Sequence, residues 1–260
     1  LLLVAGMTLS LTACGGSTDI AKTDQADGKD TFTVGFDQDF PPFGYVGDDG
    51  EFTGFDIEMA TECAARMGKK IVLQPIDWDA KDMELEAGTI DCIWNGFTMN
   101  GREDQYTWTD PYMDNSQVVV VKKDSGINTL ADLAGKVVEV QKESAAETAL
   151  NDEEHADLTA SFAQLLSVGE YNTAFMDLES GAVDAVAIDI GVAQFQIEGK
   201  EDQYQILDET ISSEQYAVGF KKGNETLRDQ VQNTLNEMKS DGTFKTIAEK
   251  WDLQDSVILD

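Results

Sequence analysis

Positively charged side chains are scarce in this sequence. Its 260 residues include 18 lysines and arginines against 50 aspartates and glutamates, which gives a formal net charge of −32 at pH 7. Nucleic-acid phosphates and anionic lipid headgroups are bound by clustered Lys and Arg, so this composition argues against both as direct partners. An acidic surface of this kind keeps a protein soluble, and we interpret the charge in that way.

Arginine is especially rare, with only three in the chain. Arg66 and Arg228 lie in stretches that predict helix surface, whereas Arg102 follows a Gly- and Asn-rich loop, "NGFTMNGRED" (95–104), after an apolar strand. A guanidinium is a planar fork that donates two parallel hydrogen bonds to a carboxylate. Arg102 is therefore a candidate for binding an anionic group, and an ordinary surface arginine is the alternative.

Histidine and cysteine, which supply many nucleophiles and metal ligands, are almost absent. His155 is the only histidine and lies in the polar stretch "NDEEHAD". No Cys–His or Ser–His pair is spaced for nucleophilic catalysis, and no cluster has metal-ligand spacing. The sequence therefore predicts a protein that is not an enzyme and holds no metal or cofactor. Cys63 and Cys92 lie among apolar residues, as either a disulfide or two buried thiols.

The apolar run at the start of the chain is too short to span a membrane. "LLLVAGMTLSLTA" (1–13) has the apolar centre and small-residue end of an export signal. "Leu11-Thr12-Ala13-Cys14" resembles the bacterial lipobox, after which cleavage leaves Cys14 as the acylated N-terminus; an ordinary signal is the alternative. Residues 14–29 predict a flexible tether. We expect an exported protein, lipid-anchored to the outer face of the cell membrane or periplasmic.

Strands alternate with helices through the rest of the chain. "TFTVGF" (31–36) alternates like a strand, Asp49-Gly50 predicts a hairpin turn, and Asp56 is predicted to cap a helix that ends at Gly68. The strand "KIVLQPI", the short helix "DAKDMELEAG" and the strand "TIDCIW" follow. This alternation predicts an α/β fold with parallel sheets.

An internal repeat divides the folded part into two similar halves. "MELEAGTIDCIWNG" (83–96) and "MDLESGAVDAVAID" (176–189) share the order helix end, Gly, Ile/Val-Asp and apolar strand. The repeat favours two α/β lobes over a chance match. Residues 116–125 and 214–224 predict two strands that cross between the lobes as a hinge. The alternative is that both are core strands of a single sheet.

Several motifs occur in an order and spacing that identify a family. They are "GFDQDFPPFGYVGDDGEFTGFDIEMA", "NGFTMNGRED", "YTWTDPY", "TLADLAGKVVEVQ" and "LNEMKSDGTFKTIAEKW". From about residue 30 to 252 the chain resembles the polar amino-acid-binding proteins of bacterial ABC importers, solute-binding protein family 3. The resemblance implies a type II periplasmic-binding-protein fold, in which two lobes close on a free amino acid and deliver it to an ABC permease.

The resemblance also implies domain boundaries and an oligomeric state. Lobe one is expected to comprise 30–117 and 216–260, with the C-terminal helices packed on it, and lobe two 118–215. The ligand cleft lies between the lobes, and two hinge strands join them. We expect a monomer.

A free amino acid needs a cation for its carboxylate and an acceptor for its ammonium. In open α/β sheets such sites lie at the carboxyl ends of strands, and both repeats end at such a place. We expect Arg102 to hold the α-carboxylate with the N–H and hydroxyl of Thr98. By resemblance, Ser144 and Ala145 at the start of a lobe-two helix supply further donors, and Asp189 accepts from the α-ammonium.

The remaining predicted contacts surround the ligand's side chain. The resemblance places Phe40 and Trp78 as apolar walls, and flat aromatic rings bury much area at low entropic cost. Trp94 is a further candidate. Asp37 would accept hydrogen bonds from a ligand amide or ammonium, which favours polar or cationic amino acids. The predicted ligand-binding residues are Asp37, Phe40, Trp78, Asn95, Gly96, Thr98, Arg102, Gln141, Ser144, Ala145 and Asp189.

The chain departs from the family pattern at two places. The loop between Thr98 and Arg102 is one residue shorter than usual, which leaves the contacts around Met99 and Asn100 open. Lys142-Glu143 replaces the usual pair of a small residue and Gly. Two other functions fit the same fold: an amino-acid-sensing module of a signalling system, and an enzyme similar to the cyclohexadienyl dehydratases.

Overall fold

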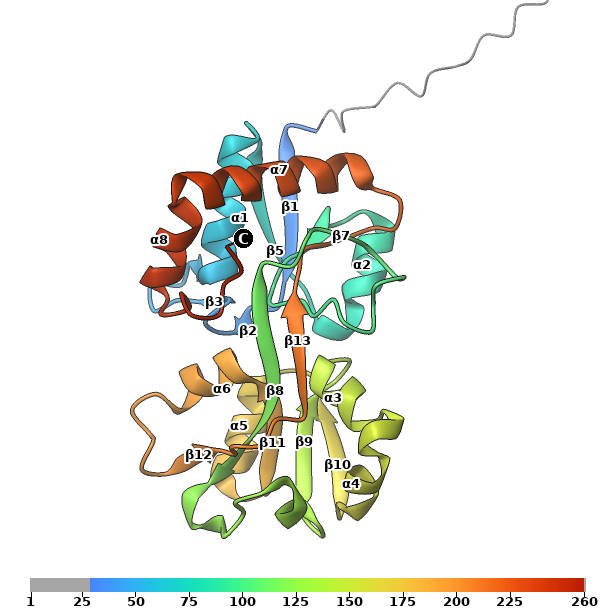
Figure 1. Ribbon diagram of the computed structural model, residues 1–260, viewed down its shortest axis with the longest axis vertical. Helices are drawn as coiled ribbons and strands as arrows, with labels where there is room; N and C mark the ends of the chain where they lie inside the picture. Colours follow the sequence, from blue (N-terminus) through green and yellow to red (C-terminus); the bar gives the residue numbers. More distant parts are fainter. Residues whose placement is uncertain (1–28, 260) are drawn as a thin grey trace, which may run out of the picture.

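A computed structural model describes residues 29–259, which form two α/β lobes (Figure 1). The predicted signal segment and Cys14 lie outside the described residues. Within 29–259 no helix is long and apolar enough to cross a membrane. The fold class predicted from the alternation of strands and helices is confirmed.

Lobe one, the upper body in Figure 1, contains a five-stranded sheet and a small antiparallel sheet. The first sheet has the order β5-β1-β6-β14-β7, in which β5, β1 and β6 are parallel and β14 is antiparallel to both of its neighbours. Its strands are β1 (Thr31–Phe36), β5 (Lys70–Pro75), β6 (Cys92–Ile93), β7 (Thr107–Trp108) and β14 (Gly219–Phe220), and the small sheet consists of β2 (Asp39–Phe40), β3 (Gly44–Val46) and β4 (Phe52–Thr53).

Within the described residues, lobe one contains four α-helices, and the two C-terminal ones, α7 and α8, pack against α1 (Figure 1). The helices are α1 (Phe55–Arg66), the 3₁₀ helix η1 (Trp78–Ala80), α2 (Lys81–Ala87), α7 (Glu225–Asp241) and α8 (Thr243–Lys250). The chain therefore returns from lobe two to complete the core of lobe one.

Lobe two is built on the sheet β10-β9-β11-β8-β12, to which β13 adds by pairing with β8. Strands β10, β9 and β11 are parallel, and β8 is antiparallel to its neighbours. The strands are β8 (Met113–Lys122), β9 (Val137–Gln141), β10 (Gln164–Val168), β11 (Ala185–Asp189), β12 (Tyr204–Ile206) and β13 (Ser212–Tyr216). The helices are η2 (Lys123–Ser125), η3 (Leu130–Leu133), α3 (Ala145–Leu150), η4 (Glu153–His155), α4 (Ala156–Ser161), α5 (Tyr171–Ser180) and α6 (Ile190–Ile197).

Two strands connect the lobes. β8 and β13, green and orange in Figure 1, run side by side through the waist of the molecule. They pair antiparallel from Gln117 opposite Ser212 to Met113 opposite Tyr216. From Gln117 onward β8 also pairs with the rest of the lobe-two sheet. The alternative of two core strands in a single sheet is therefore wrong.

The internal repeat corresponds to the same unit in each lobe. Gly88 follows α2 and Gly181 follows α5 as C-cap residues, with φ of 75° and 81° in the left-handed region that glycine adopts at little cost. Each glycine is followed by an inner strand, β6 in lobe one and β11 in lobe two. The loops that leave these two strands therefore occupy equivalent positions on the two lobes.

The apolar core continues from one lobe into the other. A single cluster of buried residues includes Phe40 and Phe43 of lobe one and Tyr171 of lobe two. The ring centroids of Phe40 and Tyr171 are 6.1 Å apart. Cys63 and Cys92 lie in this cluster as free thiols, and burial raises the pKa of Cys63 to about 12. Of the two alternatives, a disulfide or two buried thiols, the structure therefore shows two buried thiols.

The predicted helix cap at Asp56 is wrong, and the difference bears on the site. α1 begins at Phe55 after Gly54, which has no side chain to cap it. Asp56 is fully buried and accepts hydrogen bonds from Gly96 N–H (2.6 Å) and the Tyr112 hydroxyl (2.9 Å). Burial raises the pKa of Asp56 to about 7, although both donors oppose the shift. Asp56 thus fixes the loop after β6.

Candidate functional site

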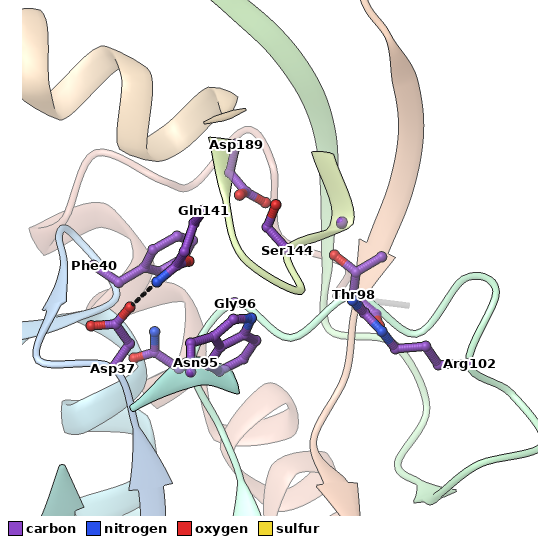
Figure 2. A pocket seen from close by; sticks show the side chains of 11 residues that line it. Asp37, Phe40, Asn95, Gly96, Thr98, Arg102, Gln141, Ser144 and Asp189 are labelled. Atoms are coloured by element: carbon purple, nitrogen blue, oxygen red, sulfur yellow. Dashed lines mark hydrogen bonds between the residues drawn. The ribbon is translucent and has the colours of Figure 1, made fainter. Parts of the chain in front are cut away.

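The eleven residues predicted for ligand binding line one pocket between the lobes, with about 290 Å³ of empty space that is partly open to solvent. Figure 2 shows Asp189 and Ser144 on one side of this pocket, Asp37 and Asn95 on another, and Thr98 and Arg102 on a third. The eleven residues therefore lie together in space, and their role in ligand binding stays a prediction. Trp94, the further candidate, is fully buried and does not line the pocket.

The carboxyl ends of parallel strands bring most of these residues together. Asp37 directly follows β1, and Asn95 lies two residues after the end of β6. Because β1 and β6 are parallel neighbours, both residues reach the same pocket. In lobe two, Gln141 ends β9 and Asp189 ends β11, which are again parallel neighbours. Ligand sites of open α/β sheets lie at this edge, because loops that leave neighbouring strands there converge.

Arg102 is held at the mouth of the pocket by contacts within its own loop and across the cleft. Its Nη1 donates to the carbonyl oxygen of Thr98 (3.1 Å), and its Nη2 donates to that of Glu143 in lobe two (3.2 Å). The guanidinium carbon lies 5.4 Å from the centre of the Phe97 ring. A guanidinium has five N–H donors, so these two bonds leave three for a ligand.

The shortened loop before Arg102 is fixed to the hinge strand β13. Met99 N–H donates to the carbonyl oxygen of Gln215 (2.9 Å), and Gln215 N–H donates to the Asn100 side chain (2.8 Å). The Trp108 indole N–H donates to the carbonyl oxygen of Arg102 (3.1 Å). The loop that carries Arg102 is therefore tied to a strand that crosses between the lobes.

Asp189 is the acidic counterpart of Arg102 from lobe two. Its Oδ1 accepts hydrogen bonds from the side chains of Asn115 (2.7 Å), Gln117 (2.7 Å) and Tyr216 (2.6 Å). Burial is the main cause that raises the pKa of Asp189 to about 7, and the nearby Glu214 carboxylate is the second, while the three donors oppose the shift. An Asp189 carboxylate surrounded by neutral donors is suited to a cationic ligand group.

Asp37 and Gln141 meet across the cleft. The Gln141 amide donates to Asp37 Oδ2 (2.6 Å), as the dashed line in Figure 2 shows. Burial raises the pKa of Asp37 to about 6, and the donors Asp39 N–H and Gln141 lower it. Asp37 is 4% exposed, so it is an acceptor within the pocket itself.

Two aromatic side chains and one helix start complete the lining. Phe40 and Trp78 are buried, and the Trp78 ring meets Phe97 edge-on at 5.5 Å. Ser144 caps α3, because its hydroxyl oxygen accepts from Glu147 N–H (3.0 Å). The Thr98 hydroxyl donates to Glu214 Oε1 (2.7 Å). Thr98 therefore links the Arg102 loop to the hinge as well as lining the pocket.

The departure at 142–143 produces two ion pairs across the cleft. Glu143 has a φ of 57°, in the left-handed region that Gly adopts at little cost, and Gly is the residue that the family pattern leads us to expect here. Its carboxylate pairs with Lys81 Nζ of lobe one (2.8 Å), and Lys142 Nζ pairs with Asp79 (2.7 Å). Lys81 is only 3% exposed, so its ammonium depends on the Glu143 carboxylate when the lobes are together.

The sequence analysis missed the groups that support the site from behind. Asn115, Gln117 and Glu214 are buried on the two crossing strands, and Lys81 is buried at the start of α2. Asn115 and Gln117 alternate with Asp114 and Ser116 in a strand that then becomes wholly apolar. Alternating amides that precede a buried strand were the available signal.

Comparison with known proteins identifies the chain. The model of the bacterial extracellular solute-binding proteins, family 3, matches residues 32–254. The chain belongs to this family. Among curated relatives, the L-cystine-binding protein TcyJ of Escherichia coli strain K12 is 31% identical over 252 residues, which cover 96% of this chain and 91% of TcyJ.

Solved structures of the family share both sequence and fold with the chain. A substrate-binding protein of an ABC uptake transporter from Streptococcus pneumoniae with bound histidine is 34% identical, with a TM-score of 0.81 over 85% of this chain and 92% of that one. An ancestral arginine-binding protein bound to arginine is 37% identical, with a TM-score of 0.78 over 86% and 98%. The two-lobe family fold is therefore established for this chain.

The cleft ion pair of Lys81 gives a test of lobe contact. Glu143→Gln keeps the size of the side chain but leaves the Lys81 ammonium without its carboxylate when the lobes meet, so the open state should gain population. We expect acetylation of Lys81 by an amine-reactive reagent, followed by mass spectrometry, to be faster by about fivefold or more. Glu249→Gln, which removes the exposed ion pair of Lys245 within α8, should leave Lys81 unchanged. Equal Lys81 labelling in the parent and Glu143→Gln would contradict a contribution of this pair to closure.

Proposed function

We propose that this protein captures a free L-amino acid between its lobes and delivers it to an ABC permease. One observation carries the proposal: a guanidinium from lobe one and a carboxylate from lobe two, Arg102 and Asp189, line the same pocket. A free amino acid carries a charge of each sign on neighbouring atoms. The pocket offers each end a partner of opposite charge from a different lobe.

The proposed pose places the α-carboxylate against Arg102 and the α-ammonium against Asp189. The remaining N–H donors of Arg102 and the backbone around Thr98, Ser144 and Ala145 contribute to the carboxylate end. Phe40 and Trp78 contact the side chain of the ligand, and Asn95, Gly96 and Gln141 complete its surroundings. Gly96 must be glycine here, because its φ is 56° and an added Cβ would meet the rings of Phe40 and Tyr216 at 3.0–3.2 Å.

The charges around the side-chain end favour polar or cationic amino acids. Asp37 lines the pocket and is shared with a second, wider cavity. That cavity is also lined by the carboxylates of Asp39, Asp77, Asp79, Glu84 and Glu170. An acidic ligand side chain directed to this region would meet like charge, whereas a cationic one would be attracted. The named ligands of the family members above, cystine, histidine and arginine, agree with this preference.

Binding by two lobes requires that they move as bodies. We take 30–117 with 216–260 as one body and 118–215 as the other, with β8 and β13 as the hinge near 114–118 and 211–217. The ends of strands absorb backbone rotation without breaking a packed core. A ligand shifts an open–closed equilibrium by its differential affinity, and a site divided between the lobes supplies that difference.

Export and anchoring follow from the family and the first residues of the sequence. Family members act outside the cytoplasm, and we propose that lipid attached to Cys14 holds this protein at the outer face of the membrane. The tether of 14–29 then gives the binding lobes freedom to reach the permease. We propose that the protein works as a monomer.

Two other functions receive less support. Within the described residues no three His, Cys, Asp or Glu side chains form a metal site, and His155 does not line the pocket. Burial raises the pKa of the pocket carboxyls Asp37 and Asp189 to about 6 and about 7, and both already accept two or more hydrogen bonds. A binding protein therefore fits this pocket better than an enzyme similar to the cyclohexadienyl dehydratases. A sensing role would use the same site with a different partner.

A calorimetric panel tests the proposed function. Protein that has been unfolded and refolded, to remove any retained amino acid, is titrated with L-arginine, L-lysine, L-cystine, L-glutamine, L-histidine, L-glutamate and L-aspartate. We expect at least one cationic or neutral polar member to bind with a Kd below about 10 µM, and the two acidic ones to bind at least about tenfold more weakly. Absence of binding by every member would refute the function; tightest binding of glutamate would refute the side-chain preference.

Arg102→Ala tests the carboxylate contact. The variant leaves the ligand's carboxylate without its cation in a closed cleft, at a cost of roughly 3–5 kcal/mol. Calorimetry with the tightest-binding amino acid should show affinity lower by more than about a hundredfold. Arg66→Ala, which removes an arginine paired with Glu62 and Asp241 on the surface of lobe one, is the matched control. Binding by Arg102→Ala within about threefold of the control would remove Arg102 from the site.

A further inference from the structure

A second carboxylate lies behind Asp189. Glu214 of the hinge strand β13 is 7% exposed and does not line the pocket. The Asn115 amide nitrogen donates to Asp189 Oδ1 (2.7 Å) and to Glu214 Oε1 (2.7 Å). The Gln117 amide nitrogen also donates to both, at 2.7 Å and 2.8 Å. Two side-chain amides therefore bridge the same pair of carboxylates.

Every side-chain hydrogen-bond donor that the structure shows for this pair is neutral. Besides the two amides, the Tyr216 hydroxyl donates to Asp189 (2.6 Å) and the Thr98 hydroxyl donates to Glu214 (2.7 Å). No Lys or Arg of the described residues is ion-paired with either carboxylate. Two buried negative charges without a cation are expensive, because hydrogen bonds from neutral donors offset only part of the lost hydration.

Two events can lower the unfavourable free energy of burying these two negative charges. One carboxylate can take up a proton, or a cation can arrive beside the pair. The pocket offers the second route, because Asp189 both belongs to the pair and lines the pocket. The two routes compete, since a proton on the pair removes the charge that a ligand ammonium needs.

We infer that Glu214 is a positioning residue for the ammonium subsite: it forms with Asp189 a carboxylate pair that holds one proton and releases it when an ammonium group binds. The inference rests on the proposed function for the identity of the ligand group. Glu214 thereby becomes a residue that supports the ammonium subsite. Amino-acid binding then depends on pH because the carboxylate pair of the protein loses a proton, and not because the ligand titrates.

The electrostatics of Asp189 agree with this role. Burial and the Glu214 charge raise the pKa of Asp189 to about 7. An ammonium beside Asp189 favours the ionised form and lowers that pKa, so binding expels a proton wherever the free protein still holds it. Affinity should therefore rise as pH increases toward 7 and become level above it. With a pKa of about 7 for Asp189 in the free protein, the affinity should be about tenfold lower at pH 6 than at pH 8.

Other titratable groups near the pair have to be separated from it. Asp37 is in the same pocket, and burial raises its pKa to about 6. Tyr216 and Tyr171 face Asp189, and burial raises the pKa of each phenol well above its ordinary value, so both stay protonated over this range. Asp37 is thus the group whose titration must be distinguished from that of the pair.

The test is to count protons released on binding. Calorimetry at pH 6.5, in buffers with different ionisation enthalpies, uses the tightest-binding member of the amino-acid panel. We expect about 0.8 proton released by the parent and about 0.2 by Glu214→Gln, which keeps the shape and the acceptor oxygen but removes the charge. The pH dependence of affinity between pH 6 and 8 should fall from about tenfold to about twofold.

Two matched variants complete the test. Glu139→Gln neutralises another buried lobe-two carboxylate, on β9 and away from the pair, and should release as many protons as the parent. Asp37→Asn should still release about 0.5 proton or more, whatever its affinity. Release by Glu214→Gln equal to that of the parent, or loss of release in Asp37→Asn alone, would overturn the inference.

A measurement without ligand separates this inference from the proposed function. The side-chain carboxyl carbon of Asp189, followed by NMR through a pH titration, should show a step near pH 7 that Glu214→Gln moves down by about one unit. If no amino acid binds but this step is present, the proposed function fails and the proton-holding pair stands. If amino acids bind and Glu214→Gln leaves the titration of Asp189 unchanged, the inference fails alone.

Discussion

The attraction between a ligand's two charges and two oppositely charged side chains on separate lobes is the constraint on which this structure depends. Arg102 and Asp189 are 87 positions apart in the sequence and lie on different bodies, yet they line one pocket. Neither lobe alone offers both charges. The two sheets, the crossing strands and the loops at the carboxyl ends of β6 and β11 together bring the charges to one place.

The cleft is held by more than the groups assigned to the ligand. Gln141 donates to Asp37, Lys142 pairs with Asp79, and Glu143 pairs with the buried Lys81, each across the boundary between the lobes. Lys142 and Glu143 stand where the family pattern leads us to expect a small residue and Gly, so the two ion pairs depend on this departure from the pattern. Such contacts stabilise the closed state whether or not they touch an amino acid. They therefore affect the open–closed equilibrium of the free protein, and with it the differential affinity that the ligand needs to close the lobes.

Much of this arrangement could be predicted from the sequence, because it depends on local pattern. The repeated helix–Gly–strand unit predicted the two lobes and led to the strand ends before the Arg102 loop and at Asp189, whereas Asp37 and the role of Asp189 were predicted from the resemblance to the family. Glu214 and Lys81 escaped prediction, since their roles arise only when segments far apart in the chain meet. Asp56 was misread for the same reason: its position suggests a helix cap, but burial turns its carboxylate toward Gly96 and Tyr112.

Small-angle X-ray scattering with and without ligand tests most directly whether the lobes close on an amino acid. The refolded protein is measured alone and with a saturating concentration of the panel member that binds most tightly. A site divided between Arg102 and Asp189 predicts a smaller radius of gyration with ligand, and no change for Arg102→Ala at the same ligand concentration. A radius of gyration that stays the same while calorimetry reports full binding would contradict the two-lobe account.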